Sequence, residues 1–89
     1  MPKYHPTRGG HAPGHVREAF QDAIDGDGTL AEYVVIDDTP RPLTWLVGQL
    51  WNCTDIVPSA TCWSLDMPQG STYAQAARVV KARLGQHRS

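Results

Sequence analysis

The expected fold depends on residues 58–84, PSATCWSLDMPQGSTYAQAARVVKARL, which carry helical patterns on both sides of a turn. The first pattern predicts a helix over about 57–66 whose buried side chains are Cys62, Trp63 and Leu65. The segment MPQG follows as a turn, because Pro and Gly interrupt helices. The second pattern repeats apolar residues at helical spacing and predicts a helix over 71–85, with Gly85 as its C-cap.

The start of this last helix carries a specific N-terminal pattern. Thr72 and Gln75 stand three positions apart and fit a capping box, in which each side chain bonds to the other residue's backbone N–H. One side of the helix is apolar and is expected to be buried. That buried stripe consists of Tyr73, Ala76, Ala77, Val80 and Leu84.

This helix, turn and basic helix resemble the helix-turn-helix of DNA-binding proteins. The shared features are a small residue facing the partner helix, an apolar residue before the turn and one within it: Cys62, Leu65 and Met67. The resemblance implies that the second helix enters the major groove. The DNA contacts that it implies are Ser71, Thr72, Gln75 and Arg78 toward base edges, and Lys81 and Arg83 toward phosphates. Asp66 stands where the motif usually has Gly, which puts the turn in doubt.

Outside this region the chain predicts two more helices and one uncertain element. Residues 15–24 repeat apolar positions at helical spacing, and the DGDG that follows ends the helix. The β-branched run at 30–36, LAEYVVI, favours a short strand, with a helical turn as the alternative. Asp-Thr-Pro at 38–40 is typical of a helix start and predicts a helix over about 41–52.

Together these elements predict a mainly α fold, a small bundle of about four helices that contains the helix-turn-helix, with one short strand or hairpin left open as an addition. The chain of 89 residues has room for one domain. We expect a flexible basic arm over 1–14, a helical domain over 15–85 and a tail over 86–89. In style the chain is similar to small proteins of actinobacteria and their phages, a likeness that implies no function.

The charge is unevenly distributed, although the net value is only −1. All nine acids lie between residues 18 and 66, where Arg41 is the only base, and both ends of the chain are basic. Basic ends favour contact with an anionic partner, and the simpler interpretation is that the blocks attract one another in the fold. The acidic block would repel DNA, which is the main physical objection to DNA binding.

The sequence contains no recognisable catalytic pattern and no metal pattern. His11 and His15 are separated by Pro and Gly, and Cys53 and Cys62 are too far apart for a zinc knuckle. We therefore expect no enzyme, no cofactor and no metal, and two buried, reduced thiols.

The favoured function is a small DNA-binding regulator or phage-type accessory factor that reads the major groove with the helix at 71–85. Its partner is double-stranded DNA, a homodimer or protein partner would add contacts, and no membrane is involved. We expect a cytoplasmic location. The alternatives are a helical hairpin with a solvated basic face, and an adaptor or inhibitor that docks on another protein through Trp45 and the acidic block at 18–66.

Overall fold

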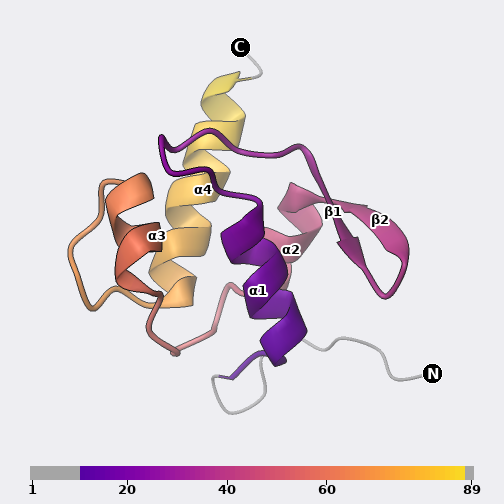
Figure 1. Ribbon diagram of the computed structural model, residues 1–89, viewed down its shortest axis with the longest axis horizontal. Coiled ribbons are helices and arrows are strands. Elements are labelled where there is room, and N and C mark those ends of the chain that lie inside the picture. Colours follow the sequence, from indigo (N-terminus) through magenta and orange to yellow (C-terminus); the bar gives the residue numbers. More distant parts are fainter. Residues whose placement is uncertain (1–10, 88–89) are drawn as a thin grey trace.

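Four helices and one two-stranded hairpin make up residues 11–87, the part of the chain that this computed structural model describes (Figure 1). The predicted arm therefore lies largely outside the described residues. In chain order the elements are α1 Gly14–Asp22, β1 Tyr33–Ile36, β2 Thr39–Pro42, α2 Leu43–Gln49, α3 Ser59–Ser64 and α4 Tyr73–His87.

The expectation of a mainly α bundle is wrong, because the chain is a mixed α/β fold. The described residues are 47% helical and 16% strand. The uncertain run at 30–36 supplies β1, which pairs with β2 in an antiparallel hairpin. Residues 39–42, which were expected to start a helix, form β2 instead, so that α2 begins at Leu43.

The turn between the strands explains this difference. Asp37 and Asp38 both have positive φ, 50° and 61°, which is the backbone of a two-residue type I′ hairpin turn. Pro40 and Pro42 lie opposite Val35 and Tyr33 in the register. At these two positions the N–H of β2 takes no part in the hydrogen bonds between the strands. Proline, which is otherwise typical of a helix start, is therefore compatible with this strand.

The core lies where α1, α2 and α4 meet beneath the hairpin. Phe20 of α1, Leu46 of α2 and Val80 of α4 are each 0% exposed. The rings of Phe20 and Tyr73 meet edge to face, with centroids 5.9 Å apart. The predicted stripe of α4 is buried at Tyr73, Ala76, Ala77 and Val80 and half-buried at Leu84.

The core assignment of α3 is correct at two positions and wrong at one. Cys62 and Leu65 are buried, but Trp63 is 78% exposed. α3 packs on the core with the side that carries Thr61 and Cys62. Trp63 follows Cys62 directly, about 100° further around the helix, and therefore faces solvent.

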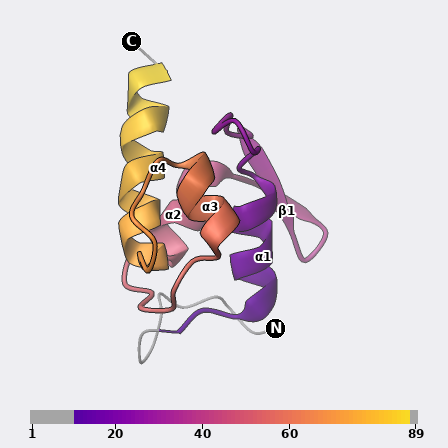
Figure 2. The same ribbon diagram turned by 60° about the vertical axis from the view of Figure 1, so that its left-hand side comes forward.

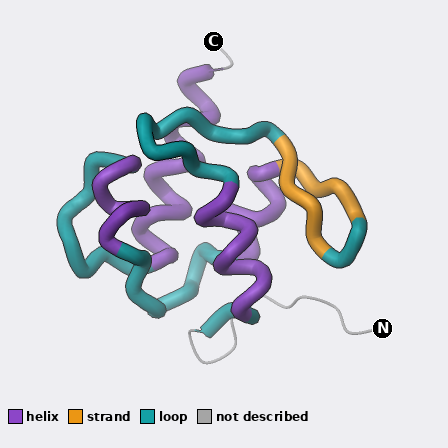
Figure 3. The backbone as a smooth tube through the Cα atoms, in the orientation of Figure 1, coloured by secondary structure: helices purple, strands orange, loops and turns teal. Residues whose placement is uncertain are grey.

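A short strand-like pairing fixes where α4 begins. The segments at 53–57 and 71–74 run antiparallel: the N–H of Val57 donates to the carbonyl of Ser71, and the N–H of Tyr73 donates to that of Asp55, both at 2.9 Å. The loop that connects α3 to α4, in teal in Figure 3, returns along α3 to reach this pairing. α4 therefore starts beside the segment that precedes α3.

No helix within residues 11–87 is long and apolar enough to cross a lipid bilayer.

Replacing Asp38 by Gly should stabilise the protein, because glycine adopts positive φ without steric cost. A non-glycine residue at positive φ costs about 1–2 kcal/mol of folding free energy. Glycine removes this cost, but its greater freedom in the unfolded chain offsets about half of the gain in stability. We expect a rise of about 4 °C in Tm by circular dichroism. Asp38→Ala removes the same charge and keeps Cβ, so it should give no such rise. An equal gain from Asp38→Ala would show that charge, not backbone strain, limits this turn.

Candidate nucleic-acid interface

Two tryptophan rings on the outer side of the molecule lie beneath basic side chains. Above the ring of Trp51, the guanidinium carbon of Arg78 is 4.2 Å and the Lys81 ammonium 5.1 Å from the ring centre. The guanidinium carbon of Arg41 lies 4.8 Å from the centre of the Trp45 ring. All three distances are typical of cation–π contacts. We call these five residues the α2–α4 face.

The packing of α2 against α4 brings these residues together. Leu84 near the end of α4 lines a hollow with Leu43 at the start of α2, whereas Arg78 contacts Trp51 just beyond the end of α2. The two helices are therefore antiparallel. Trp45 and Gly48 are three residues apart and fall on one side of α2, and Trp51 follows in the turn after the helix. Gly48 between the tryptophans has open space where a Cβ would be, so the surface between the two rings is unobstructed.

Hydrogen bonds hold Arg78 in place. Its Nη1 donates to the carbonyl oxygens of Trp51, at 3.0 Å, and Ala74, at 2.9 Å. A guanidinium has five N–H groups in a planar fork. The Nε–Nη2 edge is not used by these two bonds, and this edge can bind a phosphate through two parallel hydrogen bonds. Arg78 is thus oriented before any ligand arrives, which lowers the entropy cost of a contact.

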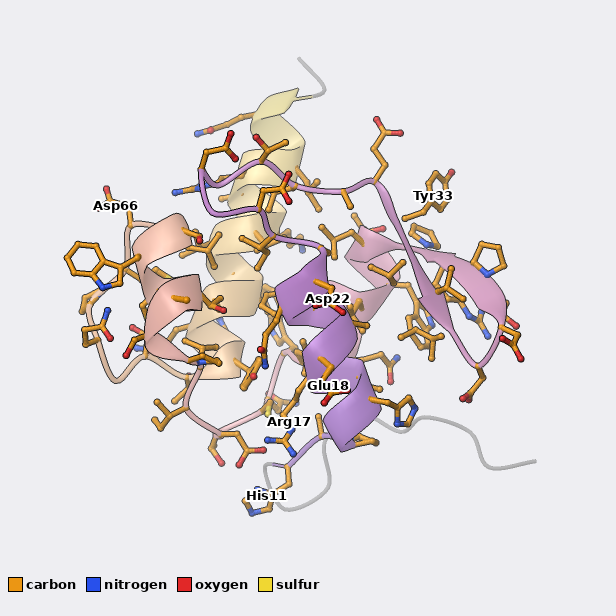
Figure 4. The ribbon with its side chains drawn as sticks, viewed as in Figure 1. His11, Arg17, Glu18, Asp22, Tyr33 and Asp66 are labelled. Carbon is orange, nitrogen blue, oxygen red and sulfur yellow. The ribbon has the colours of Figure 1, made fainter. Side chains whose placement is uncertain are left out.

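No acid belongs to the segments that build this face. Residues 39–54 and 67–89 contain no Asp or Glu. Glu18 and Asp22 project from α1 toward the viewer in Figure 4, whereas α2 and α4 lie behind α1. Figure 2, turned by 60°, shows α1 and α4 on opposite sides of the molecule. The repulsion from the acids of α1 is therefore directed away from the α2–α4 face, whereas Glu32 lines the same hollow as Leu43 and Leu84.

The remaining predicted DNA contacts do not gather with Arg78 and Lys81. Ser71 is buried, and its hydroxyl donates to the carbonyl of Pro68 at 2.6 Å. Thr72 and Gln75 form the predicted capping box: the Thr72 N–H donates to Gln75 Oε1 at 2.9 Å and the Gln75 N–H to Thr72 Oγ1 at 3.2 Å. The capping box is confirmed, and it engages both side chains at the N-terminus of α4.

Arg83 belongs to another part of the surface. Its Nη2 donates to the carbonyl of Leu65 at 2.8 Å. It lines a hollow together with Asp27, a carboxylate that would oppose an anionic ligand there. Arg83 therefore serves as a matched control for Arg78, since both are arginines of α4 that bond to a carbonyl of a neighbouring segment.

The connection between α3 and α4 is longer than the turn of a helix-turn-helix. That motif uses three or four residues to hold its helices at a steep angle. Here residues 65–72 intervene, and the loop returns along α3, with the Met67 N–H donating to the carbonyl of Cys62 at 2.8 Å. The neighbour of α4 that matters for its exposed side is therefore α2 rather than α3.

Sequence patterns did not identify Arg41 and Trp51 as members of this site. The spacing of Arg41 and Trp45 is an i, i+4 pattern and could have been noticed, although Arg41 belongs to β2. Trp51 and Arg78 are far apart in the chain, and only the packing of α2 on α4 brings them together. Trp45 itself is half-buried, with part of its ring against the core.

A second polar cluster lies near the start of α1. The ring Nδ1 of His11 is 2.8 Å from Asp55 Oδ1, and the thiol of Cys53 donates to Asp55 Oδ2 at 3.6 Å. The hydrogen bond from His11 holds the pKa of Asp55 below its usual value, and Arg17 makes a smaller contribution. Burial raises the pKa of the Cys53 thiol, so this cysteine lacks the thiolate character of a nucleophile.

Within the described residues, no group of three or more His, Cys, Asp or Glu side chains is placed to hold a metal ion. No protein-family model matches the chain, and comparisons with curated proteins and with solved structures find no match.

Asp55→Asn should destabilise the protein at pH 7 and much less at pH 3. A carboxyl whose pKa is lowered by folding stabilises the fold above its unfolded pKa, and this contribution disappears as pH falls through the folded pKa. Urea unfolding at the two pH values measures the difference. Because Asp55→Asn and His11→Phe remove the same bond, their losses at pH 7 should not add. Fully additive losses, or an Asp55→Asn loss that is equal at both pH values, would contradict this account.

Proposed function

We propose that this protein binds double-stranded DNA without catalysis, through the α2–α4 face. The observation that carries the proposal is the set of three cations placed over two tryptophan rings, on segments of the chain that contain no Asp or Glu. Phosphate contacts from Lys and Arg supply the sequence-independent part of DNA affinity. Cations that are already oriented supply it at a lower entropy cost.

The length and width of α4 suit a helix that enters the major groove. It has 15 residues and is about 22 Å long, and a helix of this width fits the major groove. Its exposed positions after Lys81 are Ala82, Gly85 and Gln86, and the first two are small, which favours close approach. In this arrangement the tryptophans and Arg41 of the α2 side lie toward the neighbouring phosphate backbone.

The proposal has consequences for assembly and location. Three cations make few phosphate contacts, so useful affinity requires a second copy or a partner protein on the same DNA. The protein would act in the cytoplasm, where DNA is accessible and thiols stay reduced. Both Cys53 and Cys62 are buried free thiols, which agrees with such a location.

Removing the charge of Arg78 should weaken DNA binding, and removing that of Arg83 should not. Fluorescence anisotropy of a labelled duplex at about 50 mM salt should give a loss of about fivefold to tenfold for Arg78→Gln, and a further loss when Lys81→Gln is added. The double variant should also reduce the slope of log affinity against log salt by about 2, because each phosphate contact contributes about 0.9.

Arg83→Gln is the matched control and should change the affinity by less than about twofold, since it removes the same charge elsewhere on α4. Equal losses for Arg78→Gln and Arg83→Gln would show that only net charge matters, and would overturn the assignment of the α2–α4 face. No binding at about 100 µM protein in low salt would overturn DNA binding itself. Thermal unfolding by circular dichroism checks that each variant is folded.

A further inference from the structure

The hairpin has two outer edges, and proline closes one of them. The ladder bonds connect Ile36 with Thr39 and Val34 with Arg41, and the Leu43 N–H continues it by donating to the carbonyl of Glu32 at 2.9 Å. The alternate positions of each strand direct their backbone groups outward. On β2 these outward positions are Pro40 and Pro42, which have no N–H to offer a further strand.

The outer edge of β1 remains open. By the same alternation, the N–H and C=O groups of Tyr33 and Val35 point away from β2. Among the backbone hydrogen bonds between separate segments of residues 11–87, none involves either residue. Their side chains are 64% and 66% exposed. Two residues before Tyr33, on the same edge, the Ala31 N–H donates to the carbonyl of Ala23 at 2.9 Å. Backbone pairing on this edge therefore ends at Ala31.

A hollow lies beside the open edge, between β1 and α1. Its volume is about 290 Å³, and it is lined by small side chains from α1 and the loop, Ala19, Ala23 and Ala31, together with Asp22 and residues 33–35. Small residues leave room for side chains of an added strand. The chain before Ala23 is α1, which packs against β1, so an added strand would occupy the hollow between these two elements.

The surroundings of this edge are acidic. Asp22 lines the hollow, and further exposed carboxylates stand on α1, before β1 and in the hairpin turn: Glu18, Glu32, Asp38 and Asp37, the last 4.0 Å from the ring of His15. Figure 4 shows Glu18 and Asp22 on the exposed side of α1, with Tyr33 beyond them at the hairpin. A strand placed here would therefore be bordered by negative charge along its length.

We propose that the outer edge of β1 binds an extended peptide segment rich in Lys or Arg as a third strand. Backbone groups of Tyr33 and Val35 supply the hydrogen bonds, the hollow receives alternate side chains, and the surrounding carboxylates select basic residues. A second copy of this chain is a poorer occupant, because antiparallel pairing of β1 with itself would bring the acids of both copies together. This inference does not depend on DNA binding, since the α2–α4 face shares none of these residues.

The test uses the full chain, labelled with ¹⁵N, and a synthetic peptide of alternating Lys and Val, about seven residues long. In the free protein, the amides of Tyr33 and Val35 should exchange with solvent faster than those of Val34 and Ile36, which face β2. Added peptide should slow exchange at Tyr33 and Val35 by about tenfold or more and leave Val34 and Ile36 unchanged. Unchanged exchange at Tyr33 and Val35 with saturating peptide would overturn the proposal.

Two kinds of variant separate strand pairing from simple attraction of charges. Val35→Pro removes the outward N–H, as Pro40 does on the opposite strand, and should weaken binding by at least about tenfold, whereas Val35→Thr should bind as the wild type does. Since Val35→Pro could disturb the hairpin, Asp22→Lys with Glu32→Lys provides a second test at exposed positions. This charge reversal should also weaken binding by about tenfold or more.

Peptide controls complete the design. A peptide of alternating Lys and Pro has the same charge but cannot form the pairing, so it should not bind; equal binding would show attraction of charge alone and overturn strand addition. A peptide of alternating Glu and Val should also fail to bind, and its binding would overturn the selection of basic residues. Self-association of the chain that disappears in Val35→Pro would identify a second copy as the occupant and overturn the peptide proposal.

Discussion

The arrangement of the whole molecule depends on where Tyr73 holds the first turn of α4. Its ring is buried against Phe20 of α1, its hydroxyl accepts a hydrogen bond from the Gln21 side chain at 2.6 Å, and its N–H donates to the carbonyl of Asp55. These contacts fix α4 to α1 and to the segment after α2 at the same point. Because α4 starts there, it runs antiparallel along α2, which places Arg78 and Lys81 over Trp51. Burial also raises the pKa of the Tyr73 hydroxyl, which keeps it neutral in this site.

Local features of the fold could be predicted from the sequence, and features that depend on pairing between distant segments could not. The capping box of Thr72 and Gln75 and the buried stripe of α4 follow from spacing within one helix, and both are present. The second strand of the hairpin, residues 39–42, was assigned to a helix because Asp-Thr-Pro is typical of a helix start when considered alone. Its role changes once β1 is available as a partner, since Pro40 then lies where no N–H is needed. Exposure of Trp63 follows from which side of α3 meets the core, a tertiary contact that periodicity did not indicate.

The candidate site shows the same division. Arg78 and Lys81 could be selected from the sequence because they stand on the polar side of an amphipathic helix. Their arrangement with Trp51 could not, since it depends on the packing of α2 against α4. Arg83 has the same charge on the same helix, yet the loop at 27–29 and the carbonyl of Leu65 give it different surroundings. Residue type and position along a helix therefore predict which side chains are polar, and tertiary contacts decide which of them act together.

Separation of charge within the fold weakens the physical objection to an anionic partner. At physiological ionic strength the screening length is about 8 Å, whereas the molecule measures 36 × 28 × 20 Å. Carboxylates of α1 therefore have little effect on an anion held beside Arg78 and Lys81, whereas Asp37 and Asp38 belong to the same hairpin as Arg41. At about 10 mM salt the screening length is about 30 Å, and the acids then reach the whole molecule. Lowering the salt thus strengthens both the attraction of the α2–α4 cations for phosphate and the opposing repulsion from the acids. The net salt dependence of DNA affinity should consequently flatten at the lowest ionic strengths, where the two contributions act over similar distances.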